Sequence, residues 1–135
     1  MIEDNIKKFL VDGENVILSD NINEGKLVLT SKRLFICGRK GFLSKEFVLK
    51  KEVEIKDIAN VHGDLGKADL LGVVGNSWLV VTPKVGEEWR CMFFSASMHL
   101  FNDFNTAQMF SISKVNNWVN AIHLELLKLL KQNAT

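Results

Sequence analysis

The histidines and cysteines are the side chains of this sequence that could carry out acid–base, nucleophilic or metal chemistry. His62, His99 and His123 stand far apart in the 135-residue chain, and none has a second ligand at close spacing. Cys37 and Cys91 each lie in an apolar, strand-like stretch, where burial makes a thiol a poor nucleophile. The chain also lacks the GxSxG, P-loop, dinucleotide-binding and HExxH patterns. We therefore expect no catalytic residue, no metal, no cofactor and two free buried thiols.

Basic residues are concentrated in one part of a chain whose formal net charge is only +1. Residues 26–56 hold nine basic and three acidic residues, whereas residues 1–25 hold two basic and six acidic residues. This uneven distribution does not favour nucleic-acid binding through overall positive charge. A binding site for an anion would instead depend on particular basic residues in the loops.

Hydrophobic periodicity predicts a mainly β chain with a long helix at its C-terminal end. Alternating or continuous apolar runs predict seven short strands. We expect the strand at residues 26–31 to be half-buried. We expect the strand at residues 46–55 to carry four residues on its apolar face: Phe47, Leu49, Val53 and Ile55. The expected strands are residues 15–22, 26–31, 33–38, 46–55, 68–75, 77–82 and 88–96.

Two helices are expected outside the strands. Residues 2–11 have the spacing of a short amphipathic helix, and residues 112–130 carry a wide apolar stripe centred on Trp118. Ser111 or Ser113 could cap the N-terminus of the second helix. The expected organisation is one domain with an N-terminal helix (residues 1–13), a β-sandwich (14–96), an extended linker (97–110) and a capping helix (111–132).

Four stretches resemble the pleckstrin-homology-like superfamily, in particular its GRAM and prokaryotic PH branches. They are GKLVLTSKRLFI, VEIKDIANV, WLVVTPKVGEEWRCMFF and VNNWVNAIHLEL, in that order along residues 14–130. The resemblance implies a seven-stranded antiparallel sandwich or partial barrel capped by one long helix. It also implies a non-enzymatic binding module, in which loops at one end of the sandwich hold an anionic lipid headgroup or a peptide.

The loops that this resemblance places at the open end carry five basic residues, and Lys32 and Arg33 lie at the other end as turn residues of the fold. Weak binding of anionic lipid is the first functional hypothesis. The alternative for this end is a solvated rim of mixed charge, since acidic residues are interspersed: Glu24, Glu46, Glu87 and Glu88. The candidate ligand-binding residues are Lys26, Arg39, Lys40, Lys45 and Lys84.

The alternative function is protein–protein interaction or self-assembly through apolar surface that the capping helix leaves uncovered. Phe101 and Phe104 belong to a segment rich in large apolar residues, and Leu124 and Leu127 lie off the apolar stripe of the helix. Either the segment 97–110 folds back as a short helix onto the domain, or a second subunit covers this surface.

The sequence also bears on location. Its N-terminal stretch lacks the basic region and apolar core of a signal peptide, and no apolar run approaches the roughly 18 residues that span a bilayer. A cytoplasmic protein is therefore expected, attached peripherally to the inner membrane surface if it binds lipid.

Overall fold

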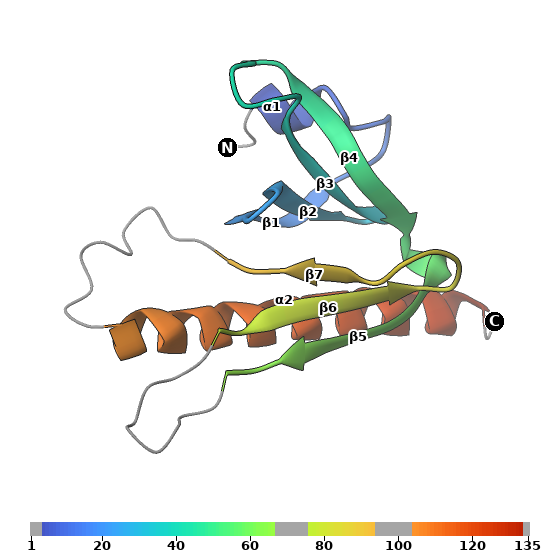
Figure 1. Cartoon of the computed structure of the whole chain (residues 1–135). Coiled ribbons are helices and arrows are strands. Elements are labelled where there is room, and N and C mark those ends of the chain that lie inside the picture. Colours follow the sequence, from blue (N-terminus) through green and yellow to red (C-terminus); the bar gives the residue numbers. More distant parts are fainter. Residues whose placement is uncertain (1–3, 67–75, 94–103, 134–135) are drawn as a thin grey trace.

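The structure, a computed structural model, describes residues 4–66, 76–93 and 104–133 and contains two antiparallel β-sheets (Figure 1). The first sheet has the order β1–β2–β3–β4 and the second β5–β6–β7. The predicted class, a mainly β sandwich with seven antiparallel strands and a C-terminal helix, is confirmed. The elements are α1 (Asp4–Lys7), β1 (Val16–Ile22), β2 (Gly25–Thr30), β3 (Arg33–Arg39), β4 (Phe47–Glu54), η1 (Ile55–Asp57), β5 (Ile58–Asp64), β6 (Trp78–Pro83), β7 (Trp89–Cys91) and α2 (Phe104–Asn133).

The two sheets meet at two places but do not form a closed barrel. The single 3₁₀ turn η1 leads directly from β4 into β5. On the other side, an antiparallel bridge joins Ile22 at the end of β1 to Phe93 after β7. The backbone N–H of Asn23 donates to the carbonyl of Met92 at 3.0 Å beside this bridge. The two sheets are thus joined at one point on each side, and a further element is needed to cover the open end between them.

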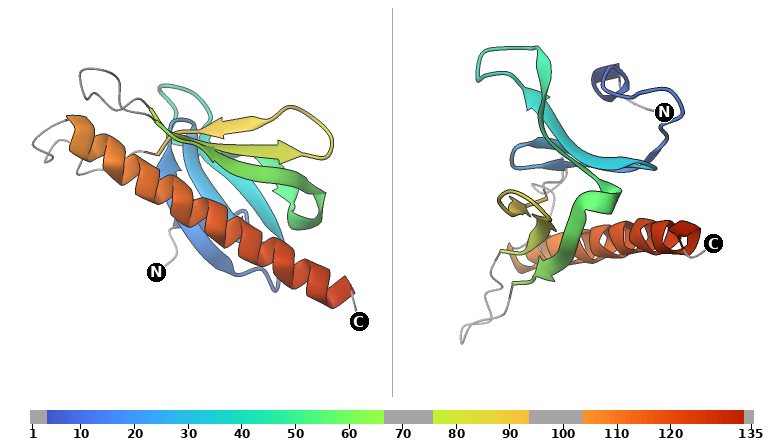
Figure 2. Two further views of the ribbon diagram at one scale, coloured as in Figure 1. Left: turned by 90° about the horizontal axis from the view of Figure 1, so that it is seen from below. Right: turned by 90° about the vertical axis from the view of Figure 1, so that its right-hand side faces the viewer.

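Helix α2 supplies that element and lies across the opening between the sheets (Figure 2). Trp118 is fully buried, and its ring stacks on Phe93 with 5.8 Å between centroids. The indole Nε1 of Trp118 donates to Asp20 Oδ2 on β1 at 2.9 Å, and Lys114 pairs with Asp20 Oδ1 at 3.0 Å. Asp20 therefore ties the helix to the first sheet, while Val115 packs in the core shared with the second.

Strands β2 and β3 are buried on both faces, which the expectation of a half-buried strand missed. Leu27, Leu29, Leu34 and Ile36 belong to the inner core. The side chains between them in β2 and β3 point to the other face of the sheet, where Ile6 of α1 packs against them. We call this set the outer cluster: Ile6, Val28, Phe35 and Cys37.

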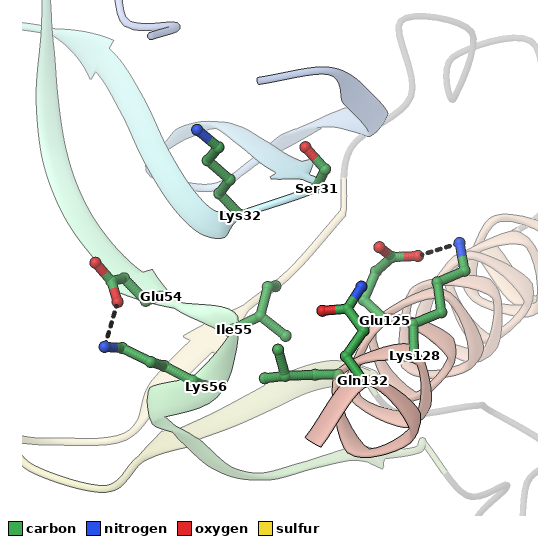
Figure 3. Close-up of a pocket in the computed structure, with 9 residues that line it drawn as sticks. Ser31, Lys32, Glu54, Ile55, Lys56, Glu125, Lys128 and Gln132 are labelled. Carbon is green, nitrogen blue, oxygen red and sulfur yellow. Dashed lines mark hydrogen bonds and ion pairs between the residues drawn. The ribbon is translucent and has the colours of Figure 1, made fainter. Parts of the chain in front are cut away.

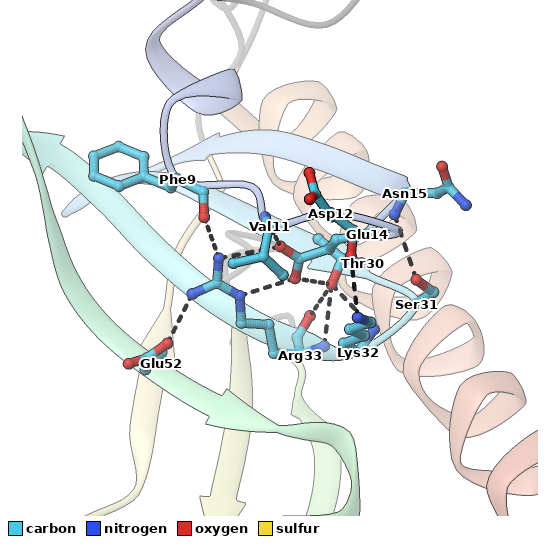
Figure 4. A network of polar contacts seen from close by, with 10 residues as sticks. All are labelled: Phe9, Val11, Asp12, Glu14, Asn15, Thr30, Ser31, Lys32, Arg33 and Glu52. Carbon is cyan, nitrogen blue, oxygen red and sulfur yellow. Dashed lines mark hydrogen bonds and ion pairs between the residues drawn. The ribbon is translucent and has the colours of Figure 1, made fainter.

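A polar network holds the N-terminal segment on this outer face (Figure 4). Arg33 donates from Nε to Glu14 Oε2 at 2.8 Å and from Nη1 to Glu52 at 2.7 Å. Its Nη2 donates to the carbonyl of Phe9. The Thr30 hydroxyl donates to Glu14 Oε2 at 2.6 Å. Arg33 is thus a structural residue, as predicted, and it fastens the segment that covers β2 and β3.

The side-chain orientation predicted for β4 is wrong for its first half. A bulge opposite Ile36 and Cys37 shifts the register of β3 and β4. Val53 therefore lies in the inner core, whereas Phe47 packs against the outer cluster. A bulge adds one residue to one strand and so reverses which face each following side chain occupies.

The fifth strand is also not where it was predicted. Residues 58–64, expected to wind down into a turn, form β5, and the expected strand at 68–75 lies outside the described residues. Ile58 and Val61 are its buried residues, three positions apart rather than two or four. A register shift between Ile58 and Asn60 explains this spacing, because it interrupts the alternation by which a strand is recognised.

Both helix boundaries differ from the prediction. Helix α2 begins at Phe104, so residues 104–110 belong to it and not to an extended linker. Ser111 and Ser113 therefore lie inside the helix and do not cap it, and the Ser111 hydroxyl faces the carbonyl of Phe93 at 3.5 Å. Helix α1 ends at Lys7, after which the chain crosses the sheet in turns.

Replacing Glu14 by Gln should lower the free energy of unfolding by about 2 kcal/mol at neutral pH, because Arg33 loses a charged partner. Burial alone raises the pKa of Glu14, but hydrogen bonds from Arg33, Thr30 and the Val11 N–H together lower this pKa below 4.5. The carboxylate therefore stabilises the fold above pH 4.5, and this contribution is lost as pH falls through the folded-state pKa. Urea unfolding measures this: the difference in free energy of unfolding between the wild type and the Glu14→Gln protein should shrink as pH falls through that pKa.

The control for this prediction is Glu54→Gln, which breaks only an exposed ion pair with Lys56. It should change the free energy of unfolding by less than about 0.5 kcal/mol. A Glu14→Gln difference that stays constant from neutral to acid pH would contradict the role given to this carboxylate.

Candidate functional site

The residues suited to catalysis or metal binding do not come together in the described part of the chain. No group of three or more histidine, cysteine, aspartate or glutamate side chains there could hold a metal ion. His62 and His123 are exposed on β5 and α2, and His99 lies outside the described residues.

Neither cysteine forms a disulfide and both are buried, which confirms the predicted burial. Burial, with a smaller contribution from Glu24, raises the pKa of the Cys91 thiol to about 12. Cys37 belongs to the outer cluster and Cys91 to the inner core. A thiol with the pKa of Cys91 stays protonated at neutral pH and is a poor nucleophile.

Two glycines bring the β1–β2 turn against the end of β3. Gly25 has a φ of 139°, and a Cβ there would lie 2.4 Å from the carbonyl oxygen of Cys37. A Cβ on Gly38 would lie 2.7 Å from the carbonyl oxygen of Glu24. Only the absence of side chains at both positions lets the two backbone segments approach this closely.

This close approach places three basic residues around one cavity of about 360 Å³, lined among others by Lys26, Arg39 and Lys50. Lys26 Nζ donates to Asn21 Oδ1 at 2.8 Å, and Lys50 Nζ donates to the carbonyl of Glu24 at 3.0 Å. Arg39 is exposed and reaches the cavity from the last position of β3. The sequence prediction that Lys26 and Arg39 lie at the same end of the sandwich agrees with this geometry.

The loop that follows Arg39 presents two large apolar side chains to solvent. The Ser44 N–H donates to the carbonyl of Gly41 at 3.2 Å, so Phe42 and Leu43 occupy the two central positions of a β-turn. Phe42 is 95% exposed and Leu43 is 91% exposed. The Lys40 N–H donates to the carbonyl of Glu46 at 2.8 Å and closes the base of the loop. We refer to Phe42 and Leu43 as the apolar tip.

Exposed basic side chains flank the apolar tip on both sides. Arg39 and Lys40 precede it, and Lys45 follows it. Together with Lys26, four of the five predicted ligand-binding residues lie at this end of the molecule. The apolar tip itself was not predicted, because adjacent apolar residues in a loop show neither helical nor strand periodicity. The signal was a Phe-Leu pair between two basic stretches that are rich in turn residues.

Lys84 lies at the opposite end, so its inclusion in the predicted site was wrong. Its backbone N–H donates to the carbonyl of Asp57 at 2.8 Å, just after β4 ends. Lys84 lines the same surface pocket as Arg33, the first residue of β3. The apolar tip follows the last residue of β3 and so lies at the other end of this strand. The register explains this placement, because Pro83 pairs with Ile58 at the start of β5.

A larger cavity of about 530 Å³ lies between the β2–β3 turn, η1 and the end of α2 (Figure 3). Two of its lysines are already paired with glutamates, Lys56 with Glu54 at 3.3 Å and Lys128 with Glu125 at 2.9 Å. The third, Lys32, donates to the carbonyl of Asp12, so the charged groups of this cavity already have partners within the protein.

The residues predicted for an interaction surface have mixed outcomes. Leu124 and Leu127 are both 54% exposed on α2, as the helical stripe indicated. Phe104 is the first residue of α2, and Phe101 lies outside the described residues. Residues 104–110 continue α2, so the predicted short helix that folds back is wrong for this part of the segment.

No family model, curated protein or solved structure matches this chain. The resemblance to PH-like domains therefore stays a prediction. Within the described residues, no helix combines the length and the apolar character needed to cross a membrane.

Gly25→Ala and Gly38→Ala should each lower the free energy of unfolding by about 2 kcal/mol or more, because the added Cβ would meet backbone atoms that cannot move aside. Gly41→Ala is the matched control, since a Cβ there has no neighbour within 4 Å, and it should cost less than about 0.5 kcal/mol. Thermal or urea unfolding measures all three. Equal effects at Gly38 and Gly41 would show that the close approach does not constrain the turn.

Proposed function

We propose that this chain is a non-enzymatic, PH-like binding module that docks on anionic membrane surfaces through the loop between β3 and β4. One observation carries the proposal: the apolar tip is almost completely exposed on a turn whose neighbours are basic. A soluble domain gains nothing from holding Phe and Leu in water at the end of a hairpin. Exposed apolar groups of this kind mark surfaces that are buried by a partner.

A bilayer suits both parts of this loop. Transfer of Phe42 and Leu43 into the apolar region of a membrane would contribute about 1.5–3 kcal/mol for each fully buried side chain. Arg39, Lys40 and Lys45 would then lie at the level of the headgroups, where each basic residue contributes about 1 kcal/mol near an anionic surface. Glu46, which is exposed beside Lys45, offsets part of this attraction.

The cavity beside the loop offers a place for one phosphate-bearing headgroup. Lys26 and Lys50 line it, and their ammonium groups are oriented by hydrogen bonds to Asn21 and to the Glu24 carbonyl. Arg39 lines this cavity and also precedes the apolar tip in the sequence, so it would contact a lipid held at either place. The resemblance to PH-like domains supports the same end of the sandwich as the ligand-binding end.

Vesicles containing about 30 mol% phosphatidylserine should sediment the protein at low salt and release it as ionic strength rises. Phe42→Ser with Leu43→Ser should reduce binding about tenfold or more, because apolar insertion is lost. Arg39→Ala with Lys40→Ala should reduce it to a similar extent, because the electrostatic attraction is lost. Co-sedimentation with vesicles of defined composition measures each effect.

The control is Lys84→Ala with Val85→Ser, which removes a basic and a 90% exposed apolar side chain from the turn at the opposite end. This variant should bind as the wild type does. Equal binding to vesicles of neutral lipid, or an equal loss in the control variant, would exclude docking by this loop.

A further inference from the structure

Helix α1 lies at the same end of the molecule as the apolar tip. In Figure 1 and in the right-hand view of Figure 2, α1 and the β3–β4 loop are both at the top of the molecule, whereas α2 is in its lower half. The second view is turned about the vertical axis, so the two views agree on the height of both elements. A flat surface that meets the apolar tip at this end can therefore meet α1 as well.

Lys8, the residue after α1, reaches the base of this loop. Its Nζ donates to the carbonyl of Phe47, the first residue of β4. Phe47 pairs with Arg39, and these two residues are the last pair between β3 and β4 before the loop. The Lys8 ammonium thus lies where the loop begins, although Lys8 and Phe47 are 39 residues apart in the sequence.

The positive charge of Lys8 is not neutralised by a carboxylate in the described part of the chain. There it contacts two uncharged groups, the carbonyl of Phe47 and the ring of Phe9, whose centroid lies 5.0 Å from Nζ. Lys7, by contrast, pairs with Asp4 at 3.9 Å. Lys8 is also exposed in spite of both contacts. An exposed ammonium with uncharged partners keeps its attraction for an anionic surface.

The neighbouring acidic side chains leave this end of the molecule positive. Residues 4–8 and 39–46 together hold five basic and two acidic residues, and the acidic ones are Asp4 and Glu46. Replacing Lys8 by a neutral residue would lower the excess from three positive charges to two. Lys8 is therefore a substantial part of the charge that α1 and the loop present together.

A second contact would also fix the orientation of the domain. Phe42 and Leu43 are adjacent residues of one turn, so their insertion anchors a single point and leaves the domain free to tilt about it. A contact made by a different segment of the chain restricts this tilt. Lys8 comes from the N-terminal segment and meets that requirement.

We propose that Lys8 is a second membrane contact, whose ammonium lies at the level of anionic lipid headgroups while the apolar tip inserts beside it. The inference rests on the proposed function and extends the docking surface from one loop to the N-terminal segment. Together the two contacts hold the domain on the bilayer in one orientation, with α2 on the side away from the lipid.

Lys8 also fastens the N-terminal segment to the sheet, and Lys32 offers a matched comparison for that role. Lys32 Nζ donates to the carbonyl of Asp12 in the same segment at 3.3 Å. It stands in the β2–β3 turn, directly before β3 begins, and so lies at the end of the strand opposite to the apolar tip. Fastening applies to both lysines, whereas membrane contact applies to Lys8 alone.

The test compares Lys8→Gln, which removes the charge but keeps an N–H donor, with Lys8→Arg and Lys32→Gln. Lys8→Gln should weaken binding to vesicles with about 30 mol% phosphatidylserine about fivefold at low salt, because one basic residue near such a surface contributes about 1 kcal/mol. Lys8→Arg and Lys32→Gln should bind as the wild type does. The difference between the wild type and Lys8→Gln should shrink as ionic strength rises. Co-sedimentation measures binding, and urea unfolding verifies that each variant folds.

The outcomes separate this inference from the proposed function. Wild-type binding by Lys8→Gln, together with a loss in the Phe42→Ser, Leu43→Ser protein, would overturn the role of Lys8 and keep the loop as the docking site. Equal losses in Lys8→Gln and Lys32→Gln would also overturn it, because fastening of the segment would then explain both. A wild-type protein that does not bind the vesicles would overturn the proposed function and this inference together.

Discussion

The two central strands of the first sheet carry apolar side chains on both faces, and the rest of the structure follows from the need to cover both. On the inner side, the second sheet and α2 bury Leu27, Leu29, Leu34 and Ile36. On the outer side, the N-terminal segment packs on Phe35 and its neighbours, with Val16 of β1 and Phe47 of β4 at the edges. A four-residue helix has little stability of its own. Arg33 compensates by binding Glu14 and the carbonyl of Phe9. Lys8 and Lys32 add bonds to the carbonyls of Phe47 and Asp12, and together these contacts hold the N-terminal segment, the outer cover of the sheet, in place.

Local patterns predicted the class of the fold but not every strand. The buried stripe around Trp118 depends on neighbouring residues alone and was found as predicted. The half-buried strand expected at residues 26–31 was not found, because both faces of β2 are covered. The error at Phe47 has a different origin, since one extra residue in the strand reverses the face and only the pairing with β3 reveals it. The same holds for β5. Its irregular pairing with β6 interrupts the apolar alternation, so its sequence resembles a turn.

The candidate site was predicted in part, for reasons of the same kind. Lys26, Arg39, Lys40 and Lys45 flank turns that are close in sequence to their own strands, so their placement needed only the topology of the first sheet. Placing Lys84 required the direction of the β5–β6 hairpin, which follows from a strand that the sequence pattern did not reveal. The apolar tip is recognised by the exposure of Phe42 and Leu43 in the folded protein. The composition of a loop does not reveal which of its side chains are exposed.

The tie between Asp20 and Trp118 has a consequence for the order in which the chain is completed during synthesis. Strands β1 to β4 pair with their neighbours in the chain, and the outer cover precedes them, so residues 4–54 contain every partner that the first sheet needs on its outer side. The inner side of the sheet cannot be covered until α2 has been synthesised, because Asp20 and Trp118 are separated by 98 residues. A nascent chain that has emerged only as far as β7 has all seven of the described strands and an uncovered core. Domains with such late, long-range closure expose apolar surface to chaperones and to each other until the final segment docks.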